Sequence, residues 1–153
     1  MAQTTVDGVE GLRAVVGQHL GHSDWVTITQ ERVNLFAEAT GDSQWIHVDV
    51  ERATAESPFG GPVAHGHLTL SLVPVLLAQI VEITGFRMAV NYGTENVRFP
   101  APVPVGSRVR AGAGLERVTE FEGGVQMHLS VTVEVEGAGK PSLVALVLLR
   151  RYL

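Results

Sequence analysis

The stretch Val125-Gln-Met-His-Leu-Ser-Val-Thr-Val-Glu-Val-Glu136 alternates apolar and polar side chains over its whole length. A period of two is typical of a strand that buries one face and exposes the other. A second alternation runs from Arg108 to Glu116, and Glu122, Gly123 and Gly124 supply turn residues between the two segments. The pattern therefore predicts an antiparallel hairpin.

Two more segments predict strands of the same sheet. Leu143–Leu149 is apolar without alternation, as expected of a strand that is covered on both faces. Met88–Phe99 precedes the proline-rich joint Pro100–Pro104 and is also expected to be extended.

Helices are expected before these strands. Gly66–Thr84 is apolar on nearly all sides, which predicts a helix surrounded by other structure, with Gly85 as its end. Pro74 is expected to kink or divide it, because proline lacks an N–H and crowds the preceding turn. Thr29 can cap a shorter helix that Gly41 ends.

Together these elements predict an α+β fold in which a curved antiparallel sheet wraps a long central helix. With 153 residues, 45% of them hydrophobic, the chain suits one domain over residues 1–153. The sheet leaves an edge or an outer face for another partner, most simply a second copy, so we expect a homodimer.

Composition argues against several classes of partner. A formal net charge of -5 and a single lysine give no footprint for nucleic acid or anionic lipid. The apolar stretch Leu68–Ile83 is interrupted by polar residues and is shorter than the roughly 20 residues of a membrane span. Met1–Gly11 does not resemble a secretory signal, and the chain has no cysteine. We therefore expect a cytoplasmic protein.

Asp42 and His47 are the first candidate site residues. They are five apart, so their side chains converge only if the chain turns between them, and Gly41 and Ser43 favour such a turn. A carboxylate beside an imidazole can hold and polarise one water molecule. The alternative is that Asp42 caps a turn and His47 is an ordinary structural residue.

The segment Gly61-Pro-Val-Ala-His-Gly-His67 is the second candidate, because it leads into the long apolar helix. Free N–H groups at a helix start attract developing negative charge, and Gly66 allows a substrate carbonyl to come close. The alternative is a simple loop and helix entry.

Several histidines and carboxylates suggest a metal site, but their spacing does not match a helical pair of ligands. We therefore expect no metal and no cofactor. This set is His47, His65 and His67 with Asp42 or Asp49.

The two motifs together resemble the MaoC-like dehydratase family, the (R)-specific enoyl-CoA hydratases of hotdog fold. The residues that carry this resemblance are Ala39-Thr-Gly-Asp-Ser-Gln-Trp-Ile-His-Val-Asp49 and Pro62-Val-Ala-His-Gly66. Asn91–Gly106 is similar to the next strand and turn of the family. Gln44-Trp45 replaces the usual Asn-Pro and resembles the nodulation protein N subgroup.

The resemblance implies that Asp42 and His47 hold the water that adds to a 2-enoyl thioester, and that the Gly66 N–H binds the thioester carbonyl. His65, Trp45 and Ser71 are candidate pocket residues, although packing would also explain Trp45 and a bond to its own backbone would also explain Ser71. The expected substrate is an acyl-CoA rather than an acyl carrier protein, since carrier proteins are acidic and this chain is net negative. A hotdog thioesterase and a non-catalytic acyl-thioester binding module remain the alternatives.

Overall fold

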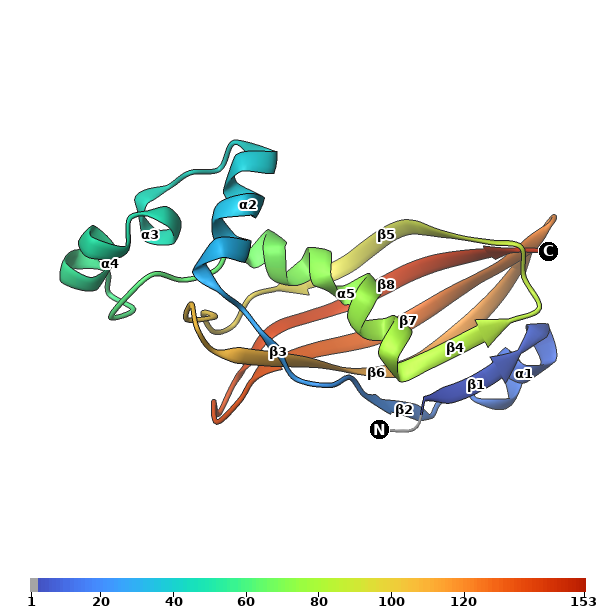
Figure 1. The fold of residues 1–153 in the computed structure, drawn as a ribbon. Coiled ribbons are helices and arrows are strands. Elements are labelled where there is room, and N and C mark those ends of the chain that lie inside the picture. Colours follow the sequence, from blue (N-terminus) through green and yellow to red (C-terminus); the bar gives the residue numbers. More distant parts are fainter. Residues whose placement is uncertain (1–2) are drawn as a thin grey trace.

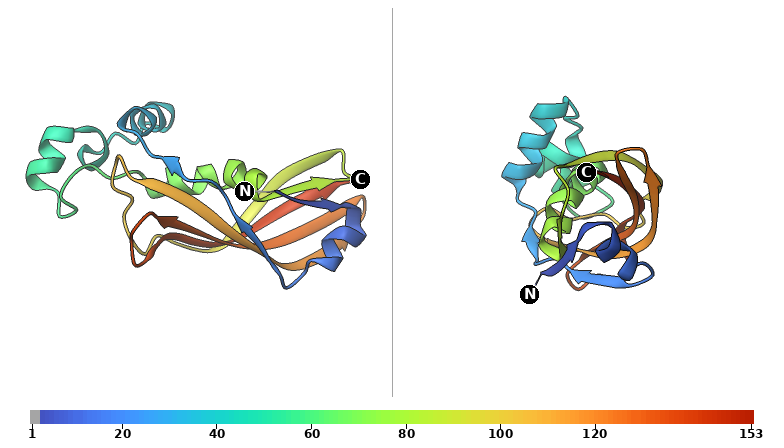
Figure 2. Two further views of the ribbon diagram at one scale, coloured as in Figure 1. Left: turned by 60° about the horizontal axis from the view of Figure 1, so that its bottom comes forward. Right: turned by 90° about the vertical axis from the view of Figure 1, so that its right-hand side faces the viewer.

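An antiparallel sheet curls around one long helix in the computed structural model, which describes residues 3–153 (Figures 1 and 2). The main path through the sheet follows the order β2-β6-β7-β8-β5, and the short β3 also pairs with β6. The strands are β2 (His19–His22), β3 (Val26–Thr27), β5 (Met88–Arg98), β6 (Arg108–Phe121), β7 (Gly124–Val135) and β8 (Pro141–Tyr152). The central helix is α5 (Gly66–Ile80).

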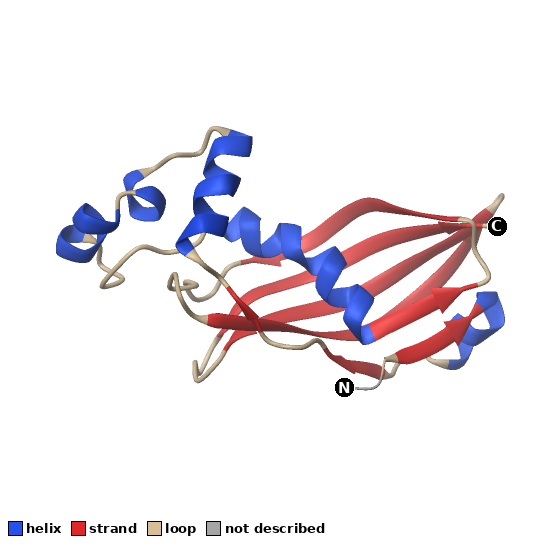
Figure 3. Cartoon of the chain, viewed as in Figure 1, coloured by secondary structure: helices blue, strands red, loops and turns tan. Residues whose placement is uncertain are grey.

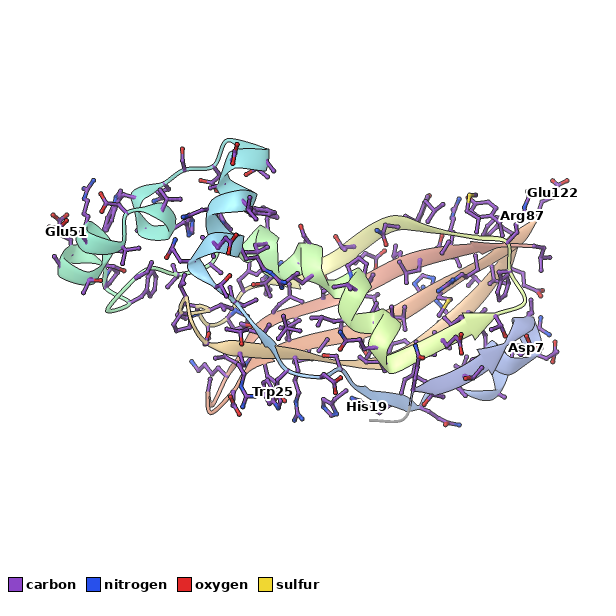
Figure 4. All side chains as sticks on the ribbon, viewed as in Figure 1. Asp7, His19, Trp25, Glu51, Arg87 and Glu122 are labelled. Carbon is purple, nitrogen blue, oxygen red and sulfur yellow. The ribbon has the colours of Figure 1, made fainter. Side chains whose placement is uncertain are left out.

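The core lies between α5 and the concave face of the sheet, where side chains fill the space (Figure 4). The alternate apolar residues of β7 are almost fully buried, as the period of two predicts. The intervening polar residues are more exposed, except His128, which is 5% exposed. From α5, Val73, Leu76 and Ile80 are at most 2% exposed. The predicted curved sheet around a central helix is therefore confirmed. The expectation that the helix is surrounded on all sides was wrong for the described chain, because Pro74, Val75 and Gln79 form an exposed face of α5.

The predicted hairpin is also confirmed. Strands β6 and β7 pair antiparallel from Val109↔Val135 to Phe121↔Gly124, and Gly123 takes a φ of 91° in the turn. That left-handed conformation costs glycine nothing, which explains why the turn sequence was informative. Strand β6 is longer than the sequence pattern suggested because Glu116 forms a bulge, which breaks the alternation before the strand continues.

The predicted end of the central helix was wrong. The helix stops at Ile80, and Val81–Thr84 forms β4, which pairs in parallel with β1 (Thr4–Asp7). Three of the four β4 residues are β-branched and suit a strand, but their partner lies about 77 positions earlier in the sequence, where periodicity gives no signal. Helix α1 (Gly8–Ala14) follows β1 directly. Pro74 does not divide α5, which continues through it.

Three short helices form a segment that lies beyond one end of the sheet, called here the helical overhang, residues 30–56 (Figures 1 and 3). They are α2 (Gln30–Thr40), α3 (Trp45–Val48) and α4 (Val50–Glu56). Helix α2 begins and ends as predicted, because Thr29 Oγ1 accepts the Arg32 N–H at 3.1 Å and Gly41 has a φ of 80°. Among residues 3–153, no helix is long and apolar enough to cross a membrane.

Candidate active site

Asp42 lies in the turn between α2 and α3. Gly41 reverses the chain in the left-handed conformation, and the Ser43 N–H donates to the Gly41 carbonyl at 3.2 Å. The predicted turn is therefore present. The Asp42 side chain is exposed, and its carboxylate makes no hydrogen bond or ion pair with the residues that the structure describes. It is available to a water molecule or a substrate.

His47 lies on α3 and is only 7% exposed. Its Nδ1 is 2.6 Å from the Val63 carbonyl oxygen. A carbonyl oxygen can only accept, so Nδ1 carries the proton and Nε2 of the neutral ring keeps a lone pair. The His47 carbonyl in turn accepts the Gln30 side-chain N–H at 2.8 Å, which ties α3 to the start of α2. The ring is thus held in one tautomer and one orientation.

The side chains of Asp42, His47 and His65 come together in space. The carboxylate oxygen and the ring nitrogens that could act as ligands lie within 4.8 Å of one another. The His65 ring is 2% exposed and stacks on the His47 ring, with centroids 3.9 Å apart and planes 24° apart. The convergence that the five-residue spacing left open is therefore observed. The third member, His65, was considered from the sequence as a pocket residue and as a member of the metal set, but not as part of this pair.

The ring geometry of these two histidines disfavours a metal ion as their common partner. A metal needs nitrogen lone pairs that point to one spot about 2.1 Å from each nitrogen. Lone pairs lie in the ring planes, and the planes of His47 and His65 are nearly parallel and separated by a stacking distance. Their lone pairs therefore run side by side rather than converging. The geometry suits a carboxylate and one free imidazole nitrogen acting on water.

Gly66 is the first residue of α5, as predicted, and follows the N-terminal cap His65. Its N–H belongs to the first helical turn, where N–H groups have no partner within the helix, and no other acceptor in the described part of the chain takes it. A Cβ at this position would lie 3.0 Å from Cγ of the Phe99 ring, so only glycine fits without a shift. The N–H is free to act as a donor.

A cavity of about 310 Å³ opens beside this helix start. Its lining includes Gly66, Thr69 and Phe99, together with Ile46, the neighbour of His47 in the chain. Asp42 and His47 themselves do not line it. The cavity therefore reaches Gly66, whose N–H is the expected donor to the substrate carbonyl. It also adjoins α3, the helix that carries His47.

Two other candidates are occupied elsewhere. The Arg52 guanidinium lies 4.2 Å above the centre of the Trp45 ring, and Ser71 Oγ donates to the His67 carbonyl of its own helix at 2.7 Å. The self-bond of Ser71 is the alternative that the sequence allowed. A role for Trp45, Ser71 or His65 in the substrate pocket stays a prediction.

Sequence reasoning gave no role to Gln30 or Val63. Gln30 holds α3 through its side chain, and Val63 orients His47 through its backbone carbonyl. Every residue carries a backbone carbonyl that can accept a hydrogen bond, so the residue type at position 63 could not reveal that Val63 orients His47. These two contacts nonetheless set the tautomer and position of His47.

The sheet curled around one helix, with an acid and an imidazole at the start of that helix, defines a hotdog-fold protein. The (R)-hydratase of A. caviae involved in PHA biosynthesis matches this fold with a TM-score of 0.72 and 25% identity, over 88% of this chain and 94% of that one. The hotdog α+β class predicted from the sequence is therefore confirmed.

Sequence comparison places the chain more narrowly. Residues 12–137 match the MaoC like domain. The 3-hydroxyacyl-thioester dehydratase Z of Mycobacterium tuberculosis is 58% identical over 142 residues, which cover 92% of this chain and 93% of that protein. Nodulation protein N of Rhizobium meliloti is 47% identical over 134 residues, which cover 86% and 83%. The chain belongs to the MaoC-like dehydratase family, is an enzyme of that family, and resembles its nodulation protein N subgroup as predicted.

Proposed function

We propose that this enzyme adds water reversibly to 2-enoyl-CoA thioesters and forms (R)-3-hydroxyacyl-CoA. The observation that carries the proposal is the convergence of the Asp42 carboxylate with the ring nitrogens of His47 and His65 within 4.8 Å. The 58% identical relative is named as a dehydratase of 3-hydroxyacyl thioesters, which is the reverse of the same reaction. The A. caviae relative is named as an (R)-hydratase.

The reaction needs a water molecule that loses a proton as its oxygen attacks C3. His47 Nε2 has the lone pair to accept that hydrogen, because Nδ1–H is committed to the Val63 carbonyl. The Asp42 carboxylate accepts from the same water and so helps to orient it for attack. One member of the pair holds the proton while the C3–O bond forms. A positioned general base contributes about 10²- to 10⁴-fold to a rate.

Attack at C3 moves the electron pair of the double bond through C2 onto the thioester oxygen. The Gly66 N–H at the start of α5 is the donor for this enolate oxygen. One such donor lowers the barrier by about 3–4 kcal/mol. The enolate then collapses, C2 takes up a proton, and the product holds the hydrogen and hydroxyl of one added water.

The test is incubation of the purified protein with crotonyl-CoA, following loss of the conjugated thioester absorbance. We expect turnover for at least one chain length in a series of 2-enoyl-CoA substrates. No turnover across the series would overturn the proposal. Release of free thiol from saturated acyl-CoA would instead identify a thioesterase, and tight binding of acyl-CoA without any conversion would identify a binding module.

CoA rather than a carrier protein is proposed as the carrier of the acyl group. The formal net charge of -5 repels an acidic carrier protein at long range. A direct comparison of crotonyl-CoA with the crotonyl thioester of a carrier protein decides the matter. A higher kcat/KM for CoA supports the proposal, and a higher value for the carrier protein overturns it.

A chain without cysteine that acts on CoA thioesters fits the cytoplasm, where we place the reaction.

We also propose that the enzyme is a homodimer that pairs through β5. This strand ends the main path through the sheet, bonds to β8 on one side, and is exposed along nearly its whole length. Met88 and Tyr92 on it are 50% and 54% exposed. An open edge of this length with apolar side chains is a template for another strand. Light scattering should give twice 16.4 kDa, and the monomer mass would contradict the proposal.

A further inference from the structure

His65 is a buried titratable residue to which the proposed mechanism gives no task. Its ring is 2% exposed, and its Nε2 lies 2.8 Å from the backbone carbonyl oxygen of Asp42. Because a carbonyl oxygen only accepts, Nε2 carries a proton. The neutral ring therefore has its lone pair on Nδ1, which is buried and has no hydrogen-bond partner among the residues that the structure describes.

The two stacked histidines thus hold opposite tautomers. His47 is protonated on Nδ1 and donates to Val63, whereas His65 is protonated on Nε2 and donates to Asp42. The His65 Nδ1 that is left without a partner is buried next to the His47 ring, whose centroid is 3.9 Å from that of His65.

The contact to Asp42 matters because little else holds that residue. Asp42 follows the left-handed Gly41, and its own N–H makes only a long 3.3 Å bond to Thr40 Oγ1, two residues earlier. Among the contacts that the structure gives for Asp42, the hydrogen bond from His65 Nε2 to the Asp42 carbonyl joins the turn to the start of α5. The cap residue of the central helix therefore fixes the turn that carries the acid.

The same ring also holds the imidazole. His65 covers one face of His47 and contacts Phe36 of α2, whose centroid is 4.9 Å from its own. One buried side chain at the start of α5 is thus in contact with both members of the Asp42–His47 pair. The Gly66 N–H follows directly after it in the chain.

The geometry points to His65 as the positioning residue that sets the register between Asp42, His47 and the Gly66 N–H in the proposed hydration reaction, on which this inference rests. This role requires no contact between His65 and the water or the substrate. It acts by donating from Nε2 to the Asp42 carbonyl and by stacking on His47. A displacement of about 1 Å in such a site costs about 10²-fold in rate, so losing the donor should lower kcat.

Two substitutions distinguish the loss of the hydrogen-bond donor of His65 from the loss of its side-chain volume. In His65→Gln the amide nitrogen can occupy the place of Nε2 and reach the Asp42 carbonyl, whereas the shorter amide of His65→Asn occupies the place of Nδ1 and cannot. We expect His65→Asn to lower kcat for crotonyl-CoA about 10- to 100-fold with KM changed less than about twofold. The kcat of His65→Gln should be at least about tenfold higher than that of His65→Asn. Equal kcat in the two variants, whether both normal or both low at equal melting temperature, would overturn the inference.

A second measurement does not depend on the reaction. Long-range nitrogen NMR of the wild-type protein should show His65 as the neutral tautomer with Nε2 protonated and His47 as the tautomer with Nδ1 protonated. The Ser43 amide, which shares its peptide group with the Asp42 carbonyl, should shift in His65→Asn and stay near its wild-type position in His65→Gln. The opposite tautomer of His65, or equal Ser43 shifts, would overturn the inference. Should the wild type fail to hydrate any enoyl-CoA, the proposed function falls while this measurement still decides the contact.

Discussion

The helical overhang and the core that α5 forms with the sheet are built on different principles. In the core, apolar side chains are buried with few polar contacts, and their order follows directly from hydrophobic period. In the overhang, single hydrogen bonds set the geometry, from the Thr29 cap to the Gln30 and Val63 bonds that hold His47. Stability therefore resides in the core, whereas the proposed chemistry depends on a few polar contacts. His65 and Gly66 lie where the two meet.

The largest effect on the hydration rate should come from substitution of Asp42 or His47, the acid and the imidazole of the helical overhang. Asp42→Asn and His47→Gln should each lower kcat for crotonyl-CoA hydration about 10²- to 10⁴-fold, because the first removes the negative charge of the carboxylate and the second removes a basic nitrogen that can take a proton from the water. The melting temperature of Asp42→Asn should stay near that of the wild type, since Asp42 is exposed. His47 is buried, so circular dichroism must show that His47→Gln is folded before its rate is compared.

Asp49→Asn is the matched control for that loss. Asp49 caps α4 by accepting the Arg52 N–H at 3.0 Å, and asparagine can cap in the same way. This variant makes the same chemical change in the overhang and should keep a near-normal rate. A loss as large as that of Asp42→Asn would mean that charge in the overhang, rather than the Asp42 carboxylate, supports the reaction.

The core should respond in stability instead. Leu76 on α5 is 0% exposed, so Leu76→Ala should lower the free energy of unfolding by about 2–5 kcal/mol. Its neighbour Val75 is 55% exposed, and Val75→Ala should change it by no more than about 0.5 kcal/mol. Denaturant titration measures both. Similar losses in the two variants would show that α5 does not bury the face that the structure gives it, or that another chain covers Val75.

At the junction, Gly66→Ala should lower the hydration rate about 10- to 100-fold, somewhat less than the loss of a whole oxyanion donor. The added Cβ would meet three atoms of the Phe99 ring at 3.0–3.1 Å, so either the ring or the helix start must move. Gly61→Ala is the control, because a Cβ there meets nothing within 4 Å and the backbone is not left-handed. Steady-state kinetics that show equal losses would contradict a special role for the helix start.

The smallest effect should come from the cap of α2. Thr29→Ala removes the acceptor for the Arg32 N–H and should destabilise α2 by about 1 kcal/mol, which hydrogen exchange reports as about fivefold faster exchange of its amides. Thr54→Ala on α4 loses only a bond to the carbonyl one turn earlier and should leave exchange of α4 amides unchanged or slower. Unchanged exchange of α2 after Thr29→Ala would show that packing rather than the cap holds the overhang.

The sequence predicted the core better than the overhang, for physical reasons. The alternation in β7 and the apolar residues of α5 arise because their side chains are buried. The spacing of apolar residues along a sequence reflects such burial. Strand β4 was missed because its pairing with β1 depends on a long-range partner. For the site, residue types and order pointed to Asp42, His47 and Gly66, but not to the tautomers or to the bond between His65 and the Asp42 carbonyl. These depend on backbone carbonyls, which every residue carries.

The central claim is that one acid, one imidazole and one helix-start donor act together on the face of an enoyl thioester that leads to the (R) alcohol. Chiral analysis of the 3-hydroxybutyryl-CoA that the wild-type enzyme forms from crotonyl-CoA tests it most directly. A site with its water fixed between Asp42 and His47 should deliver oxygen to one face and yield the (R) product alone. The (S) product, a mixture of both, or no product would contradict the claim.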